Sequence, residues 1–397
     1  MLSQSENDML TRVGPGTPTG ELLRRYWHPI AIAAELTEEK PIKAVQILGE
    51  RLVVFRMPPA PGATQPRYGL VAEQCPHRLA SLAYGRVDCE GIRCPYHGWK
   101  FDAAGNCLEQ PAEPRDSKYK DEIKQPAYLV EKLAGLLFAY MGPQPAPLLP
   151  RWDVLAREDG KRWIVAESVI DCNWLQAMEN SVDPAHLYWL HSTTGHLGDH
   201  MKTYEEKREF IRFEYGIMKR RITPGKTPSD APMVDEHPLI FPTTLRHVAR
   251  DPKSGPNGEK RLRHNLQIRV PIDDEHIKVY RVNFVPSGED KSPADQDPPH
   301  EYRPLKDDDG NYYMDVVSAQ DSMAWETQGA IANRAQEKLG VSDVGIVMFR
   351  KLLKEQIDIA RSGGDPMGVL RDPGKNQIIN IPVINERIGL TRAAATA

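Results

Sequence analysis

Two short loops dominate this sequence, because each offers a thiol and an imidazole to a metal. The tripeptide CPH at residues 75–77 is followed, after sixteen residues, by CPYH at residues 94–97. The surrounding stretch, residues 43–143, consists of short apolar and β-branched runs broken by turns, as in AVQILGERLVVFRM, and this texture predicts an all-β module. We therefore expect two facing loops of a β module that clamp a metal centre.

The distribution of the four ligands separates two kinds of metal site. A structural zinc site can also use two cysteines and two histidines, so composition alone leaves zinc open. In a zinc finger, however, the two cysteines usually come together and the two histidines follow. Here Cys75 and His77 share one loop, and Cys94 and His97 share the other. This arrangement matches a Rieske [2Fe–2S] centre, in which two cysteines hold one iron and two histidines the other, and which passes one electron at a time.

The proline cluster PQPAPLLP at residues 143–150 indicates a domain boundary. We divide the chain into an N-terminal helical segment (1–42), the iron–sulfur domain (43–146) and a second domain (147–397). In the second domain, alternating runs such as HIKVYRVNFVP predict antiparallel strands. The predicted fold class is α+β, with an all-β iron–sulfur domain and a catalytic domain whose antiparallel sheet is flanked by helices. The expected helices are 17–27 with Thr17 as N-cap and Pro18 at the first position, 172–191 interrupted by Pro184, 315–338, and 342–361 capped by Ser342, whereas 286–310 is expected to be a surface loop.

A second metal motif follows the boundary. Asp183 and His186 would lie one helical turn apart on the same face, but His191 is five positions beyond His186. His191 can reach the same metal only if the helix is distorted or ends nearby, which Pro184 makes plausible. Two histidines and a distant carboxylate would form the facial triad of non-haem Fe(II) oxygenases, which leaves coordination positions open for dioxygen. A pair of histidines on a helix is nevertheless more often structural, and His196 and His200 have the better helical spacing.

Both motifs carry a family resemblance. The first, with Gly98-Trp99 after it, resembles the Rieske domains of bacterial oxygenases, and NSVDPAH-x4-H resembles the catalytic motif of Rieske oxygenase α subunits. The resemblance favours His186 and His191 as ligands of a mononuclear Fe(II). It also implies a carboxylate ligand from a late helix, for which Asp321 is the candidate and Glu326 the alternative.

The resemblance further implies how electrons travel. In these enzymes the aspartate of the second motif bridges the two metal centres across a subunit boundary, so Asp183 would link His97 of one chain to His186 of the next. Asn180 belongs to the same motif and is expected to act beside it. The implied partners are further copies of the chain, in a trimer or stacked hexamer, and a flavin/iron–sulfur reductase that delivers electrons from NADH for reaction with O2.

The implied substrate is a small aromatic acid. The resemblance is closest to the phthalate dioxygenase group, through TRVGPGTPTGELLRRYWHP, VPIDDEH and IANRAQEKLGVSD. It implies cis-dihydroxylation of a phthalate- or benzoate-type carboxylate, with O-demethylation of a methoxy-aromatic acid as the alternative. A Rieske electron carrier without oxygenase activity is the remaining alternative. An anionic substrate requires a cation, and Arg220 and Arg246 are the candidates because guanidinium pairs well with carboxylate.

Composition excludes other functions. The net charge of -4 and the pI of about 6.3 offer no basic field for nucleic acid and no polybasic membrane anchor. The polar N-terminus and the lack of a long apolar run lead us to expect a cytoplasmic protein. Five cysteines in 397 residues argue against a disulfide framework.

Overall fold

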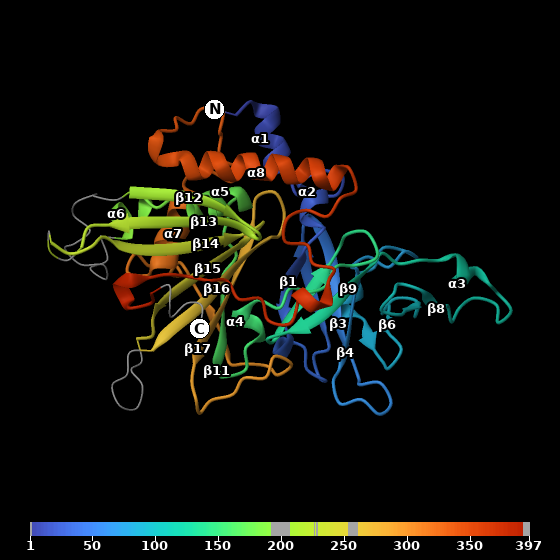
Figure 1. Cartoon of the computed structure of the whole chain (residues 1–397). Helices are drawn as coiled ribbons and strands as arrows, with labels where there is room; N and C mark the ends of the chain where they lie inside the picture. The colour runs from blue at the N-terminus through green and yellow to red at the C-terminus, as the bar shows by residue number, and fades with distance from the viewer. Residues whose placement is uncertain (1, 192–206, 226, 228, 253–260, 392–397) are drawn as a thin grey trace.

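The computed structural model describes residues 2–191, 207–225, 227, 229–252 and 261–391 (Figure 1). The chain begins with two helices, α1 (Gln4–Thr11) and α2 (Pro18–Leu23). The Thr17 hydroxyl accepts a hydrogen bond from the Gly20 N–H at 3.1 Å, and Pro18 occupies the first turn of α2. The predicted cap and start of this helix are therefore confirmed, although the helix ends four residues earlier than expected.

A six-stranded antiparallel sheet in the order β1-β10-β9-β4-β3-β2 forms the body of the first domain. Its strands are β1 (Trp27–Ile32), β2 (Ile42–Ile47), β3 (Glu50–Met57), β4 (Arg67–Ala72), β9 (Ala127–Leu133) and β10 (Leu136–Tyr140). The segment 1–42 is thus not only helical, because WHPIAI forms β1 and pairs with LLFAY of β10. Both strands are buried along their whole length, which explains why neither sequence alternates.

A smaller four-stranded sheet, β5-β6-β7-β8, lies at the far end of this domain. Its strands are β5 (Arg86–Val87), β6 (Ile92–Arg93), β7 (Lys100–Phe101) and β8 (Cys107–Glu109), and the short helix α3 (Tyr119–Glu122) follows them. This sheet packs around its own hydrophobic cluster. The two Cys/His loops project from it and from the end of β4.

The second domain is built on an eight-stranded sheet in the order β12-β13-β14-β15-β16-β17-β11-β18. Its strands are β11 (Gly160–Glu167), β12 (Lys207–Phe213), β13 (Gly216–Thr223), β14 (Met233–Ile240), β15 (Thr244–Arg250), β16 (Leu262–Pro271), β17 (Ile277–Pro286) and β18 (His300–Arg303). All neighbours are antiparallel except β11 and β18. The predicted antiparallel sheet is confirmed, whereas the expected surface loop 286–310 contains an edge strand.

Helices flank this sheet, as predicted. They are α4 (Asp153–Ala156), α5 (Trp174–Ser181), α6 (His186–Trp189), α7 (Val317–Glu326) and α8 (Val344–Arg361). Short 3₁₀ turns occupy Ala33–Glu35, Leu82–Tyr84, Val341–Asp343, Pro373–Lys375 and Glu386–Ile388. Two details differ from expectation: α7 ends well before residue 338, and Asp343 rather than Ser342 precedes the first residue of α8.

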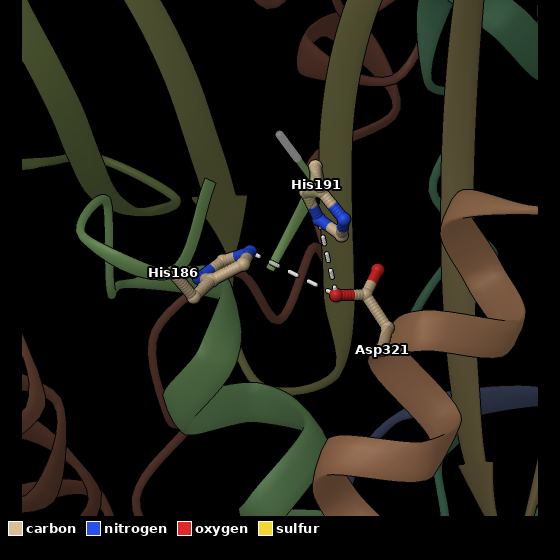
Figure 2. Close-up of side chains that lie close together, drawn as sticks. All are labelled: His186, His191 and Asp321. Atoms are coloured by element: carbon tan, nitrogen blue, oxygen red, sulfur yellow. Dashed lines mark ion pairs between the residues drawn. The ribbon is translucent and has the colours of Figure 1, made fainter. Parts of the chain in front are cut away.

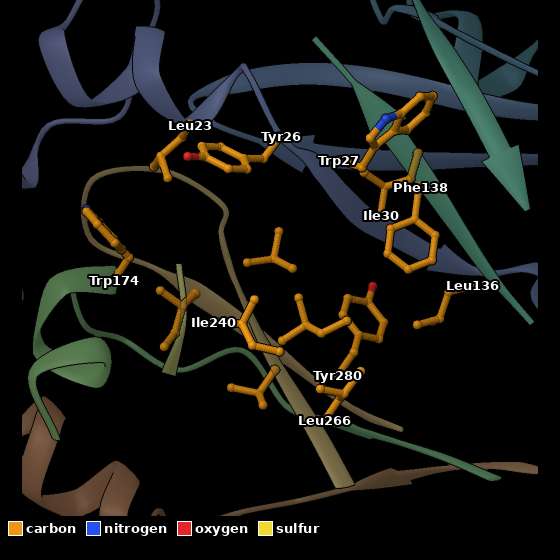
Figure 3. Packing of buried hydrophobic residues seen from close by; sticks show 14 of the residues in the cluster. Leu23, Tyr26, Trp27, Ile30, Leu136, Phe138, Trp174, Ile240, Leu266 and Tyr280 are labelled. Atoms are coloured by element: carbon orange, nitrogen blue, oxygen red, sulfur yellow. The ribbon is translucent and has the colours of Figure 1, made fainter. Parts of the chain in front are cut away.

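One hydrophobic cluster joins the two domains. Figure 3 shows residues of the first domain, such as Trp27 and Phe138, packed near Leu266 and Tyr280 of the second. This shared core holds the iron–sulfur domain against one end of the catalytic sheet. Among the described residues, no helix has both the length and the apolar composition that a membrane crossing requires.

Candidate metal centres

The two Cys/His loops have the same backbone construction. The Leu79 N–H donates to the Cys75 carbonyl at 2.9 Å, and the Gly98 N–H donates to the Cys94 carbonyl at 3.2 Å. Each cysteine N–H in turn donates to the carbonyl five residues later, that of Ala80 or Trp99. The fourth residue after each cysteine has a positive φ, 60° for Leu79 and 75° for Gly98. The chain thus presents two matched turns that face one another.

The ligands of these turns are sorted by type. Cys75 and Cys94 are buried in the small hydrophobic cluster, whereas His77 is exposed and His97 half-buried. The two imidazole rings lie 4.5 Å apart between centroids. Burial raises the pKa of the Cys75 thiol to about 12, and the nearby Cys94 thiol contributes to the rise. Two buried thiols in contact become anionic only if a cation neutralises them, so the donor set fits a metal cluster with thiolates inside and imidazoles outside.

Aromatic side chains hold the two histidines. The Trp99 indole stacks on the His77 imidazole with centroids 4.5 Å apart and an interplanar angle of 5°. The Tyr96 ring contacts His97 at 3.8 Å, and the Arg78 guanidinium lies 5.6 Å from the centre of the Tyr96 ring. These contacts restrict the orientation of both rings, as ligand-positioning neighbours do in metal sites.

The second motif folds as a broken helix. The helix α5 ends at Ser181, and the Asp183 carboxylate accepts a hydrogen bond from the Ala185 N–H at 2.7 Å. Pro184 cannot continue the hydrogen-bond ladder of α5, so a new short helix, α6, starts at His186. This break turns the chain so that the rings of His186 and His191 meet edge to face, with centroids 5.2 Å apart and an interplanar angle of 84°. The predicted interruption is confirmed.

The two histidines converge with a carboxylate from α7. The Asp321 Oδ1 lies 3.3 Å from His191 Nε2 and 3.8 Å from His186 Nε2. One donor atom from each residue falls within 4.8 Å of the other two, and Figure 2 shows the three side chains pointing toward a common point. Two imidazoles and one carboxylate on one side of a site match the 2-His-1-carboxylate donor set of non-haem Fe(II). The runner-up Glu326 instead accepts hydrogen bonds from Tyr312 and from the Asp171 N–H.

A buried glutamine sets the tautomer of His191. Gln320 is 0% exposed, and its Nε2 donates to the Met314 carbonyl at 2.8 Å. This orientation leaves Gln320 Oε1 facing His191 Nδ1 at 2.7 Å, so Nδ1 must carry the proton. His191 Nε2 faces Asp321 Oδ1 at 3.3 Å, and once a metal displaces the Nε2 proton, the Nε2 lone pair would be directed at the metal position. Reasoning from the sequence missed Gln320; its position next to Asp321 was the only available signal.

The remaining motif residues surround the triad. Asp183 Oδ2 lies 3.5 Å from His186 Nδ1, and Asn180 Nδ2 donates to Asp321 Oδ1 at 3.4 Å. Asp183 therefore contacts one predicted iron ligand within its own chain. His97 lies in the loop between β6 and β7, and β6 lies on the opposite side of the molecule from α6 (Figure 1). The single chain brings together the triad, and separately the four Rieske residues, but not the two centres.

Electrostatics keep the triad ready for a cation. Burial raises the pKa of Asp321, but the hydrogen bond from His191 and the neighbouring His186 outweigh it, and the pKa is lowered. Burial lowers the pKa of His191, but Asp321 and Gln320 outweigh it, and the pKa is raised. Burial likewise raises the pKa of Asp183, and the contact with His186 more than reverses this effect. Each carboxylate is thus ionised and available as a ligand or hydrogen-bond acceptor.

The two arginines expected to bind substrate are engaged elsewhere. Arg220 pairs with Glu236 at 2.8 Å, and Arg246 pairs with Asp153 at 2.8 Å. Arg246 of β15 pairs directly with Leu266 of β16, so both side chains point to the same face of the sheet. Leu266 is three positions from Arg269, and side chains an odd number of positions apart on a strand point to opposite faces. Arg246 and Arg269 therefore lie on opposite faces of the sheet.

Arg269 donates to the Ala177 carbonyl of α5, so Arg246 points away from the helices that carry the triad. The register through β14 and β15 places Arg220 on the same outer face. This placement does not favour either arginine as a contact of a substrate bound at the triad. His196 and His200, the competing histidine pair, lie outside the described residues.

Comparison with known proteins identifies one segment in each domain of the chain. Residues 26–128 match the Rieske [2Fe-2S] domain, and residues 260–380 match the family described as LigXa C-terminal domain like. The 5,5'-dehydrodivanillate O-demethylase oxygenase subunit of Sphingobium sp. strain SYK-6 is 40% identical, over 97% of this chain and 87% of that protein. The phenoxybenzoate dioxygenase subunit alpha of Ectopseudomonas oleovorans is 35% identical, over 91% and 87% respectively. The phthalate 4,5-dioxygenase oxygenase subunit of Pseudomonas putida is 31% identical, over 93% and 89%.

Solved structures share the fold. The NdmA QL mutant of Pseudomonas putida CBB5 with caffeine superposes with a TM-score of 0.65 at 22% identity, over 89% of this chain and 97% of that one. Dicamba monooxygenase bound to dicamba gives a TM-score of 0.60 at 17% identity, over 85% and 98%. The two-domain architecture is therefore shared well beyond the range of close sequence similarity.

Proposed function

Because the chain belongs to the α subunits of the Rieske non-haem iron oxygenases, we propose that it O-demethylates a methoxy-substituted aromatic acid. As the oxygenase component of a multicomponent system, it works with a reductase. The observation that carries the proposed reaction is its similarity, over nearly the whole chain, to an oxygenase subunit named for O-demethylation. The sequence alone favoured dihydroxylation; the greater identity to the O-demethylase reverses that order.

The residues of the chain would hold two iron centres. Cys75, His77, Cys94 and His97 would bind the [2Fe–2S] cluster, and His186, His191 and Asp321 the mononuclear iron. When bound, the cluster supplies electrons one at a time and the mononuclear iron activates dioxygen. The protein contributes the position of each ligand, because Gln320 fixes the His191 ring and Trp99 fixes the His77 ring.

The reaction balances as a two-electron monooxygenation. The methyl group of the ether is hydroxylated, the C–O bond to the methyl carbon breaks, and formaldehyde and a phenol leave. Dioxygen provides one atom to the formaldehyde and one to water, and NADH supplies both electrons through the reductase. Of the triad, His191 and Asp321 are buried, whereas His186 is half-buried.

Dihydroxylation of a phthalate- or benzoate-type acid is the second candidate. It is favoured by the similarity to phthalate 4,5-dioxygenase and phenoxybenzoate dioxygenase. The same donor set would serve both reactions, so the products distinguish them. A cis-diol retains every substituent carbon, whereas demethylation releases formaldehyde.

The bridging role of Asp183 is part of the same proposal. Its carboxylate already contacts His186 and accepts from the Ala185 N–H, and a carboxylate can accept further bonds. Because the Rieske loops lie on the opposite side of the molecule from the triad, the hydrogen bond from His97 to Asp183 would come from a neighbouring copy of the chain. We therefore propose a cyclic assembly, a trimer or a stacked hexamer.

The test is a product assay with purified, iron-loaded protein, a surrogate reductase and NADH. Methoxybenzoates, phthalate and benzoate are supplied in turn, and formaldehyde and cis-diols are measured. Formaldehyde in proportion to oxygen consumed would support the proposal. Diol formation without formaldehyde would instead identify the chain as a dioxygenase. If none of these acids stimulates oxygen uptake, the proposed substrate class is refuted.

A further inference from the structure

A cavity of about 1270 Å³ lies against the catalytic sheet, on the face that points away from the triad. Arg246 of β15 and His264 of β16 line it. Arg246 is two positions from Val248, which pairs with His264, so both side chains share the outer face of the sheet. The helix α4, which packs on β16 and β17, forms one wall, and residues of the segment 377–383 form another. The cavity is therefore separate from the iron site.

One side of the cavity is apolar. Ile378 lines it with 45% of its surface exposed. Leu262 also lines the cavity and packs on the buried cluster of Val383 and Leu390. Sites for small molecules combine apolar walls with a few polar groups and usually measure roughly 300–1,000 Å³. This cavity therefore has room for an organic ligand with an apolar body.

A buried ion pair orients a hydrogen-bond donor on the sheet side of the cavity. Arg246 is 1% exposed, and its Nη2 donates to Asp153 Oδ2 at 2.8 Å and to His264 Nδ1 at 2.7 Å. A guanidinium can only donate, so His264 Nδ1 accepts and the imidazole proton is on Nε2. Burial and the charge of Arg246 lower the pKa of His264 to about 4, which keeps the ring neutral near pH 7. No side chain or carbonyl of the described residues accepts from Nε2, so this N–H is available to a ligand in the cavity.

Two further arginines line the cavity without an ion pair to any carboxylate of the described residues. Arg151 Nε donates to the Gln377 carbonyl at 3.0 Å, and its terminal nitrogens remain for another acceptor. Arg261 lies just before β16 and is half-buried. Guanidinium groups with unused N–H donors are suited to bind carboxylates, because two parallel donors match the two carboxylate oxygens.

The acidic side chains of the cavity do not cancel this charge. Asp159 accepts from Arg157 at 2.7 and 2.9 Å, and Asp153 accepts from Arg246. Glu158 accepts from a backbone N–H at 3.3 Å. Four arginines thus face three carboxylates around the cavity, and the excess of positive charge favours an anion.

We infer that this cavity is a second ligand site, which binds an organic carboxylate with an apolar or aromatic body. Arg151 and Arg261 supply the positive charge, and His264 Nε2–H supplies a neutral hydrogen bond. The apolar side with Ile378 and Leu262 accommodates the body of the ligand. This inference goes beyond the proposed function, because the cavity and the triad lie on opposite faces of the sheet.

The test uses 4-benzoylbenzoate, an aromatic carboxylate whose ketone crosslinks to nearby C–H bonds under ultraviolet light. The iron-loaded full chain is irradiated with increasing amounts of the probe, and peptide mass spectrometry locates the label. We expect saturable labelling within residues 377–383. In the double variant Arg151→Gln/Arg261→Gln, the half-saturating concentration should rise roughly 10- to 100-fold. Arg212→Gln is the matched control, because Arg212 lies on β12, is 47% exposed and pairs with Glu355; its labelling should equal that of wild type.

Two comparisons on wild type test the ligand class without relying on a variant. Neutral benzophenone should label the segment about 10-fold less than the acid, and 1-naphthoate should compete with the acid. Equal labelling by acid and neutral compound, unchanged labelling in the double variant, or no label within residues 377–383 would overturn the inference. Competition by inorganic phosphate but not by 1-naphthoate would overturn it as well, since the site would then select a bare anion. Because the measurement does not depend on turnover, a negative formaldehyde assay would refute the proposed function and leave this inference standing.

Discussion

Replacing Arg334 by methionine should destabilise the chain by about 3 kcal/mol, because the buried Glu179 carboxylate then loses one of its two arginine partners. Arg334 is 1% exposed, and its guanidinium donates to both oxygens of Glu179 at 2.8–3.1 Å and to Asn7 at 3.2 Å. Breaking a buried ion pair from one side costs about 3–5 kcal/mol. The lower end applies because Arg350 still donates to Glu179 at 2.6 Å while it pairs with Glu337.

The assay is equilibrium unfolding in urea, followed by the fluorescence of the seven tryptophans, which include the buried Trp174 at the start of α5. Arg12→Met is the matched control: Arg12 pairs with Asp274 at 3.0 Å with side chains 43% and 32% exposed, and such a surface pair contributes about 0.2–1 kcal/mol. Adding Glu179→Gln to Arg334→Met removes the uncompensated charge, so the double variant should lose less stability than the sum of the single variants. A loss for Arg334→Met no larger than that for Arg12→Met, or strict additivity, would refute the reasoning.

Three further outcomes are expected. Gln320→Leu should weaken Fe(II) binding at the triad about 10- to 100-fold, as measured by metal titration, because the His191 tautomer is no longer set; Gln328→Leu, on an exposed side chain, should not change it. Burial and the charge of Arg24 lower the pKa of His28 to about 4, although the hydrogen bond to the Leu23 carbonyl opposes this shift. The contribution of His28 to stability is therefore complete above about pH 6.5 and is lost as the pH falls toward 4. The full loss is about 3 kcal/mol; urea midpoints should fall over this range, and less so in His28→Asn. Asp183→Asn should retain the Rieske spectrum but lose nearly all turnover, and retained turnover would contradict the bridging role.

Local spacing carried much of the prediction. The sequence could group Cys75 with His77 and Cys94 with His97, because the members of each pair are only two or three residues apart and must share one tight turn. The N-cap at Thr17 and the helix break at Pro184 are local in the same sense, since each depends on the hydrogen bonds of one turn. Helix ends were less accurate: α7 ends at Glu326, and the chain then turns at Gly329, which has a φ of 90°.

The third member of the triad shows the limit of spacing. Asp321 lies 130 residues after His191, and no periodicity connects positions so far apart; it was named only through the family resemblance. The structure brings its carboxylate to 3.3 Å from His191. Gln320 was missed for the same reason, since only the packing of α7 against the end of α6 turns its amide toward an imidazole.

The sequence by itself determined the chemical types of the donors and the loops and turns that present them, because these depend on interactions between near neighbours. Only the tertiary structure decided which face of the sheet each side chain occupies. Arg220 looked like a substrate ligand, but it points away from the helices, whereas the adjacent Lys219 points toward them. A shift of one residue in a strand reverses the direction of the side chain. Which of the two directions leads to the helix-covered face is decided only when the sheet and its helices pack together.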